Sequence, residues 1–265
     1  MAIHPTALVD PDARLEDGVV IGPYAVVEGG VHIGRGTEVR AHAVVKRYTT
    51  LGEGNVVHEG AILGGEPQDL TFAGGESYLR IGDGNRIREG VTIHRGNKPG
   101  AATTIGSRCF LMAYVHVAHD CVVEDGAILV NYAGLSGHVH VGAGAFVSGG
   151  ALFHQFTRIG RLAMVSGNAK VVQDCLPFVV TDGFPARARG VNVVGLRRAG
   201  VGAATIRALK EAYRTLLRSG LPLAEAVQRL EASADPLVRE LAEFARTSKR
   251  GFGHAVAGGD EDDGG

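Results

Sequence analysis

The sequence contains no tryptophan, and only 6% of its 265 residues are aromatic. Its three cysteines are odd in number and form no C-x-x-C pair, so we expect no disulfide framework and a reducing cytoplasm. A formal net charge of -1 gives the whole chain no electrostatic basis for binding nucleic acid. No apolar run approaches the roughly 20 residues of a membrane span, and MAIHPTALVD lacks the basic and apolar regions of a signal peptide.

Glycine, in contrast, is abundant, with 40 residues that follow no G-x-y period and so exclude collagen. An aliphatic or aromatic residue occupies every sixth position from Ile105 to Val171, and the same period begins at Ile3. Neither an α-helix nor a plain strand has this period. It predicts a parallel β-helix of hexapeptides, in which three hexapeptides make a turn and each wall places one apolar side chain inside. The glycines suit its tight corners.

Two segments interrupt the repeat, at 64–80 and 94–104. We expect both to project as loops from one edge of the coil, which is where repeat proteins commonly bind their ligands.

A helical period replaces the hexapeptides near the C-terminus, in ATIRALKEAYRTLLRSG, LPLAEAVQRLEASA and DPLVRELAEFARTS. These stretches predict three helices, the last with Asp235 as N-cap before Pro236. We therefore expect a β-helix domain over 1–190, a helical domain over 191–252 and a disordered tail over 253–265.

The sharpest local signal is VHVAHD, which runs from Val115 to Asp120. His119 comes two residues after the inward Val117, so its ring should lie on an outward-facing wall. A neutral imidazole with a pKa near ~6.5 can remove a proton from a sugar hydroxyl, and Asp120 can fix its tautomer. The competing interpretation is a histidine on the solvated face of a solenoid, and we favour a functional role because other histidines fall at nearby levels of the coil.

Metal binding is another use of clustered histidines, because successive turns could stack His119 near His138. The spacing of His116 and His119 suits a helix better than a strand with corners, so metal is the minor alternative. Gly137 offers a backbone N–H to a developing oxyanion, although from the sequence alone one more corner glycine is the simpler explanation.

The motifs HVAHDC, GHV, FHQF, GVNVVGL and SKRGF, in this order, resemble those of the acyl-[acyl-carrier-protein]–UDP-N-acetylglucosamine O-acyltransferase family. The resemblance covers nearly the whole chain and includes GEPQDL and NRIREGVTIHRG. It implies a left-handed parallel β-helix followed by a small C-terminal α-helical domain. It also implies a homotrimer with active sites between neighbouring coils, acyl carrier protein as donor, a UDP-sugar as acceptor, and neither cofactor nor metal.

The resemblance assigns roles to single residues. His119 matches the general base, and Asp120 matches the residue that orients it. The backbone N–H of Gly137 matches the hydrogen-bond donor to the oxyanion. Gly167 matches the position that limits acyl-chain length, and a glycine there predicts a longer chain. The remaining matches are expected to bind the sugar, the pantetheine arm or the nucleotide: Asp69, His116, His138, His154, Gln155, Asn192 and Arg198.

The chain departs from the family pattern at three positions. Thr71 stands where better-known members carry lysine, Val194 replaces an acidic residue, and Ala199 falls where a second basic residue is usual. These departures leave open a 3-amino sugar as acceptor, which would make the product an amide. Other open alternatives are the later N-acyltransferase, an acetyl-CoA-dependent enzyme, a γ-carbonic-anhydrase-type hydratase and a non-catalytic carrier-binding scaffold.

Basic residues gather in or just before the first predicted helix. They suit docking of an acidic carrier protein and equally a solvated helix face: Arg197, Arg198, Arg207, Lys210, Arg214 and Arg218.

Overall fold

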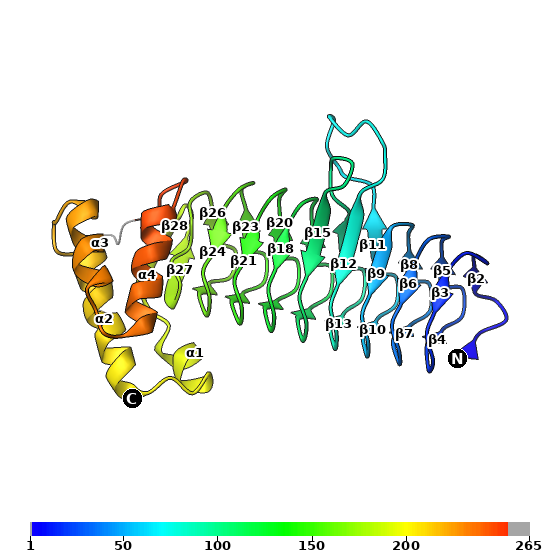
Figure 1. Cartoon of the computed structure of the whole chain (residues 1–265), viewed down its shortest axis with the longest axis horizontal. Helices are drawn as coiled ribbons and strands as arrows, with labels where there is room; N and C mark the ends of the chain where they lie inside the picture. Colours follow the sequence, from blue (N-terminus) through cyan, green and yellow to red (C-terminus); the bar gives the residue numbers. More distant parts are fainter. Residues whose placement is uncertain (1, 254–265) are drawn as a thin grey trace.

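The structure is a computed structural model that describes residues 2–253, and it consists of a long coil with helices at one end (Figure 1). The coil has three walls, each a sheet of short strands, and each hexapeptide strand up to β23 (Leu152–Phe153) pairs in parallel with the strand three places further along the chain. This architecture is the predicted parallel β-helix of hexapeptide repeats.

The first sheet contains β1 (Ala2–Ile3), β4 (Val20–Ile21), β7 (Glu38–Val39), β10 (Val56–Val57), β13 (Arg86–Ile87), β16 (Phe110–Leu111), β19 (Ile128–Leu129), β22 (Phe146–Val147), β25 (Met164–Val165), β27 (Val179–Gly183) and β28 (Ala186–Val191). The second contains β2 (Leu8–Val9), β5 (Val26–Val27), β8 (Val44–Val45), β11 (Ile62–Gly65), β14 (Thr92–His94), β17 (His116–Val117), β20 (Gly134–Leu135), β23 (Leu152–Phe153) and β26 (Lys170–Val171). The third contains β3 (Arg14–Leu15), β6 (His32–Ile33), β9 (Thr49–Leu51), β12 (Tyr78–Ile81), β15 (Ala102–Ile105), β18 (Val122–Val123), β21 (His140–Val141) and β24 (Arg158–Ile159).

The sixth-position residues form the core, because the second residue of each short strand points into the coil. Leu111, Val117 and Leu135 are fully buried, and the small residues that precede each strand, such as Ala127, are buried beside them. Ile3 keeps 43% of its surface exposed, since no further turn covers the first one. The interior is therefore a narrow stack of aliphatic side chains, as the period predicts.

The cysteines belong to this interior. Cys109, Cys121 and Cys175 are buried and free. Burial raises the pKa of Cys109 to about 11 and that of the other two to about 12. All three are protonated packing residues at neutral pH and are poor nucleophiles.

Both interruptions of the repeat project from one edge of the coil, as predicted (Figure 1). The first loop covers 66–77, between β11 and β12, and the second covers 95–101, between β14 and β15. The two loops lie against each other, because Asn97 Nδ2 donates to Thr71 Oγ1 over 3.2 Å and Arg95 donates to the carbonyl oxygen of Gly75 over 2.8 Å.

The segment from Val179 to Val191 extends the first sheet in a way that the hexapeptide period does not predict. β27 pairs in parallel with β25, and β28 returns antiparallel to β27, so the first sheet extends beyond the hexapeptides. The segment lacks the sixth-position signal because its outer strand pairs with its neighbour in a hairpin and adds no further turn to the coil.

Four helices follow β28 within the described residues. α1 (Val193–Arg198) is a short helix that the sequence analysis missed, whereas α2 (Ala203–Leu217), α3 (Leu223–Glu231) and α4 (Pro236–Thr247) correspond to the three predicted helices. Asp235 caps α4 as predicted, since its side chain accepts a hydrogen bond from Leu237 N. None of the helices within residues 2–253 is both long and apolar enough to cross a bilayer.

The helices are fastened to the last turn of the coil. Asp174, whose side chain is 1% exposed, accepts hydrogen bonds from Arg158 N at 2.9 Å and from Ser248 Oγ at 2.8 Å. Arg161 also forms a forked ion pair with Glu240 of α4. The tail predicted for 253–265 lies outside the described residues except for Gly253.

Candidate active site

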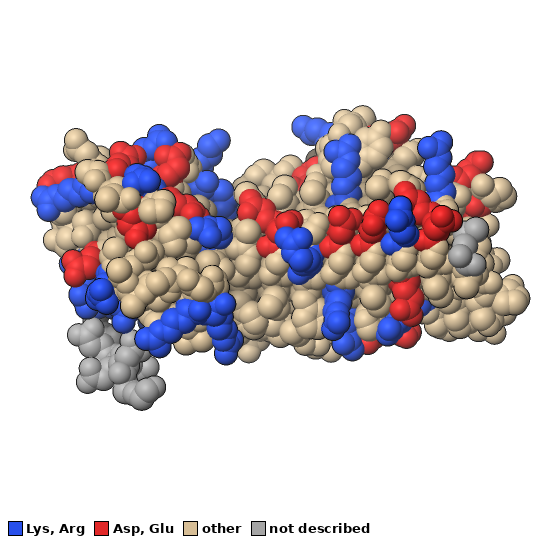
Figure 2. Space-filling view, turned by 60° about the horizontal axis from the view of Figure 1, so that its bottom comes forward, with Lys and Arg blue, Asp and Glu red and all other residues tan. Residues whose placement is uncertain are grey.

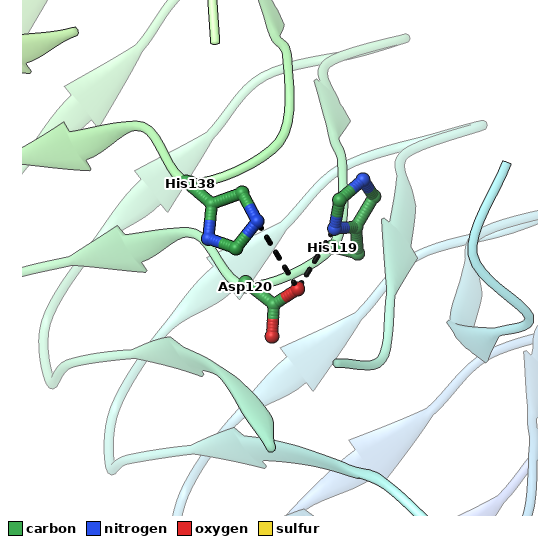
Figure 3. Close-up of side chains that lie close together, drawn as sticks. All are labelled: His119, Asp120 and His138. Carbon is green, nitrogen blue, oxygen red and sulfur yellow. Dashed lines mark hydrogen bonds and ion pairs between the residues drawn. The ribbon is translucent and has the colours of Figure 1, made fainter. Parts of the chain in front are cut away.

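His119 lies at the corner that follows β17, between the second and third sheets. Its ring stays outside the aliphatic core, as predicted, but only 7% of the residue is exposed. His119 Nδ1 is 2.8 Å from Asp120 Oδ2, and Nε2 is 3.4 Å from Asp69 Oδ2. Figure 3 shows the first of these contacts, with His138 on the other side of the same carboxylate oxygen.

Asp120 is held so that it can orient the imidazole. Its Oδ2 also accepts a hydrogen bond from Asn97 N at 3.1 Å, and its own N–H donates to Thr103 Oγ1 at 2.8 Å. An ionised carboxylate only accepts hydrogen bonds, so His119 Nδ1 carries the proton that it shares with Asp120. When the ring is neutral, Nε2 is then the unprotonated nitrogen and can accept a proton. Once the ring is protonated, Nε2–H can donate to Asp69 Oδ2.

Gly137 lies directly against the ring of His119. A Cβ atom at this position would lie 2.6 Å from His119 Cε1 and 2.7 Å from Nε2, so only glycine leaves the imidazole where it is. Within residues 2–253, the N–H of Gly137 donates to no protein acceptor. This position therefore combines a steric requirement for glycine with a free backbone donor beside the base.

His138 occupies the same corner one turn further along, so the predicted stacking of His119 and His138 is observed. Their ring centroids are 5.3 Å apart and nearly perpendicular, and His138 also stacks on Phe156 at 4.5 Å. Ligand atoms of His119, Asp120 and His138 lie within 4.8 Å of one another, as metal ligands would. The 2.8 Å contact between His119 and Asp120 has the length of a hydrogen bond, which favours the acid–base interpretation of this cluster.

A surface groove of about 550 Å³ opens beside this corner. Its lining includes six of the predicted site residues: Asp69, His116, His119, Gly137, His154 and Gln155. A second, mainly apolar groove of about 310 Å³ adjoins it and shares Leu152, Phe153 and His154 with it.

His116 forms one wall of the larger groove. Its Nδ1 is 2.8 Å from Thr92 Oγ1, and its ring meets that of His94 edge to face at 5.2 Å. Burial lowers the pKa of both histidines, and the neighbouring His94 lowers that of His116 further. These rings are therefore neutral at pH 7 and present hydrogen-bonding nitrogens without charge.

Five predicted residues do not line the larger groove: Asp120 and His138 belong to the corner beside it, and the others are Asn192, Arg198 and Gly167. Asn192 caps α1, donating to Leu162 O at 2.9 Å and accepting from Gly195 N at 3.0 Å, and Arg198 is exposed at the end of the same helix. Gly167 is exposed next to Asn168, a residue of the apolar groove. Within one chain, the nucleotide positions inferred from the resemblance are thus separate from the catalytic corner.

Three further residues, which no sequence motif singled out, hold the site together. Asn97 and Thr103 bond to Asp120, and His94 packs on His116. Their signal was the second interruption itself, which contains Asn97 and Thr103 and begins at His94.

Comparisons with protein families agree with this architecture. A model described as bacterial transferase hexapeptide (six repeats) matches residues 12–47 and 102–137. A second, described as UDP N-acetylglucosamine O-acyltransferase, domain 2, matches residues 174–253. Together with the coil and its histidine corner, these matches define a hexapeptide-repeat transferase.

Individual relatives identify the family within this class of transferases. The acyl-[acyl-carrier-protein]–UDP-N-acetylglucosamine O-acyltransferases of Synechocystis and Janthinobacterium are each 44% identical to this chain, covering 93% and 94% of it and 90% and 98% of their own lengths. The chain belongs to this O-acyltransferase family.

Solved structures of the family have the same fold. The protein from Acinetobacter baumannii is 38% identical with a TM-score of 0.93, covering 96% of this chain and all of its own. The protein from Moraxella catarrhalis is 42% identical with a TM-score of 0.92, covering 95% and 99%.

Proposed function

We propose that this chain transfers a (3R)-3-hydroxyacyl group from acyl carrier protein to the 3-hydroxyl of UDP-N-acetylglucosamine, the first step of lipid A biosynthesis. The observation that carries the proposal is the His119 imidazole, which lines the groove and has Asp120 Oδ2 at 2.8 Å from its Nδ1. Family membership supports the pair of substrates, and the geometry supports a base for an alcohol acceptor.

The proposed reaction is a direct attack without an acyl-enzyme. His119 Nε2 takes the proton of the sugar hydroxyl as its oxygen forms a bond to the thioester carbonyl carbon. Gly137 N–H stabilises the negative oxygen of the tetrahedral intermediate. The carbon–sulfur bond then breaks, and the pantetheine thiol leaves with the proton from His119, while Asp120 stabilises the imidazolium between the two steps.

The adjoining grooves suit the two substrates. His116, His154 and Gln155 border the larger one, where they are proposed to bind the sugar and the pantetheine arm together with His138, which lies against His119. The apolar groove, with Leu152 and Phe184 in its wall, is proposed to receive the acyl chain, and Gly167 is proposed to bound its far end. Burying an acyl chain there would favour binding by about 0.8 kcal/mol for each CH₂ group removed from water.

A homotrimer is part of the proposal. Apolar residues form the outer face of the first sheet in its C-terminal half, as Phe110, Ile128 and Phe146, and Leu152 on the second sheet is 59% exposed. Charges elsewhere gather in a row along the coil, beside a band with few charges (Figure 2). Apolar faces of this extent favour contact with further copies of the chain.

A trimer also accounts for the separation of the nucleotide positions. Asn192 and Arg198 lie away from the groove of their own chain, so they are proposed to serve the groove of a neighbouring copy. The basic residues of α1 and α2, among them Arg197 and Arg207, are proposed to attract the acidic carrier protein.

Mass spectrometry of the products tests the proposal. The protein is incubated with a ladder of (3R)-hydroxyacyl carriers and either UDP-N-acetylglucosamine or its 3-amino analogue. We expect a 3-O-acylated product from the first sugar and free carrier thiol in equal amount. Acylation of the amino sugar alone would replace the ester with an amide, and no product from either sugar would reject the proposal.

A further inference from the structure

Asp69 reaches His119 from the first loop, which is not part of the coil. Its Oδ2 faces His119 Nε2, whereas its Oδ1 accepts hydrogen bonds from the backbone N–H and the hydroxyl of Thr71, each at 2.7 Å. These bonds, the backbone one first, lower the pKa of Asp69, so it is ionised at neutral pH. One carboxylate oxygen is committed to its own loop, and the other is directed at the imidazole.

Asn97 connects this loop to the second one. Its amide Nδ2 is 3.2 Å from Thr71 Oγ1, and its backbone N–H donates to Asp120 Oδ2. Thr71 has a single hydroxyl hydrogen and gives it to the Asp69 carboxylate, so its oxygen can only accept from Asn97. The hydrogen bonds therefore run in one direction, from Asn97 to Thr71 to Asp69, and they join the two carboxylates that flank His119.

The base of the first loop is fixed independently by Arg95, whose side chain is 5% exposed. Arg95 donates to the carbonyl oxygen of Gly75 and pairs with Glu66 at 3.3 Å, which fastens both ends of the loop. Its guanidinium also lies 5.2 Å from the ring centroid of Phe72. Loss of the Asn97 side chain would thus release the Asp69 turn without detaching the whole loop.

We infer that Asn97 is a positioning residue, which acts through the Thr71 hydroxyl to hold the Asp69 carboxylate beside His119, where Asp69 receives a hydroxyl of the acceptor sugar. The inference rests on the proposed function for the identity of that sugar. The relay needs a side chain at position 71 that both donates and accepts, which a lysine ammonium cannot do. Thr71, a departure from the family pattern, therefore acts together with Asn97, to which it is hydrogen-bonded.

Four variants test the relay by steady-state kinetics with saturating acyl carrier. Asn97→Ala removes the first hydrogen bond of the relay and Thr71→Val removes both, and for each we expect a three- to tenfold rise in KM for the UDP-sugar with kcat within about twofold. The double variant should have a KM no higher than that of the more impaired single variant, because both changes break the same chain of hydrogen bonds. Thr71→Ser keeps the hydroxyl and should restore the wild-type KM.

Lys98→Ala is the matched control, because it removes an exposed side chain from the same loop and should leave both constants unchanged. Losses that multiply in the double variant, or a Thr71→Ser protein as impaired as Thr71→Val, would overturn the inference.

Hydrogen exchange separates this inference from the proposed function, because it needs no substrate. The Thr71 amide, which donates to Asp69, should exchange faster in Asn97→Ala than in the wild type, while amides of β12 remain protected. Unchanged exchange at Thr71 would contradict the relay. A wild-type protein that makes no product would reject the proposed function and leave the exchange result to decide on the relay.

Discussion

At the scale of single residues, the position of the His119 ring depends on the absence of a side chain at position 137. We predict that Gly137→Ala lowers kcat/KM by about a hundredfold or more, because the new Cβ would displace the imidazole by roughly an ångström. Steady-state kinetics, with urea unfolding to verify the fold, measures the effect. Gly190→Ala is the control, since an added Cβ there meets nothing within 4 Å, and equal losses in the two variants would contradict the steric argument.

Gly167 provides a second prediction at this scale. A Cβ there would lie 3.4 Å from Gly149 O, an ordinary contact, so a larger side chain is compatible with the coil. We predict that Gly167→Met shifts the preference toward shorter acyl chains, by roughly ten- to two-hundredfold in the ratio of kcat/KM values. Competition among hydroxyacyl carriers of different chain lengths measures that ratio. An unchanged preference would show that Gly167 does not border the acyl chain.

The paired rings of His94 and His116 predict a pH dependence of stability. Burial lowers the pKa of both below the ordinary 6.5, so the unfolded chain binds protons more readily than the folded one. Their contribution is complete above about pH 6.5 and is lost as the pH falls below that value. Urea midpoints should therefore decrease from pH 7.5 to pH 5.5, and less steeply in a His94→Asn, His116→Asn double variant.

Burial also lowers the pKa of His58, so the double variant should keep part of the slope. Identical slopes in the two proteins would show that these two rings do not carry the dependence.

At the scale of the element, the hexapeptide is what the sequence specifies most clearly. One buried aliphatic residue in six fixes the inward side of each wall, which is why the repeat alone assigns positions such as Val117 and Leu135 to the core. The hairpin of β27 and β28 could not be predicted in this way, because an antiparallel edge strand does not follow the period of the coil. The loops were predictable as interruptions, but their internal hydrogen bonds, such as Asn97 to Thr71, depend on tertiary contacts between the two loops.

The junction of β-helix and α-helices provides the prediction at this scale. Asp174→Ala should lower the free energy of unfolding by about 2–4 kcal/mol, because it leaves Arg158 and Ser248 without their buried acceptor. Urea denaturation followed by circular dichroism measures the loss. Asp182→Ala, which breaks an exposed ion pair with Arg189 at 3.8 Å, should change the free energy of unfolding by less than about 0.5 kcal/mol. Equal effects of the two substitutions would show that Asp174 does not stabilise the junction.

At the scale of the whole molecule, the site combines residues that the sequence places apart. Asp69 and His119 come from different turns, and only the projection of the first loop brings their side chains within 3.4 Å. The corner of His119, Asp120 and His138 was predictable because Asp120 and His138 occupy the same point of successive turns, next to His119. The positions of Asn192 and Arg198 were not, since they depend on the short helix α1, which has no periodic signal in the sequence.

The central claim is that His119 is the base that activates the sugar hydroxyl. The most direct measurement is product formation by His119→Ala, with oligomeric state and unfolding midpoint determined on the same preparation. The account predicts a fall in rate of about 10² to 10⁴, with assembly and stability close to wild type, because the ring lies outside the aliphatic core. A near-normal rate in a correctly assembled variant would contradict it.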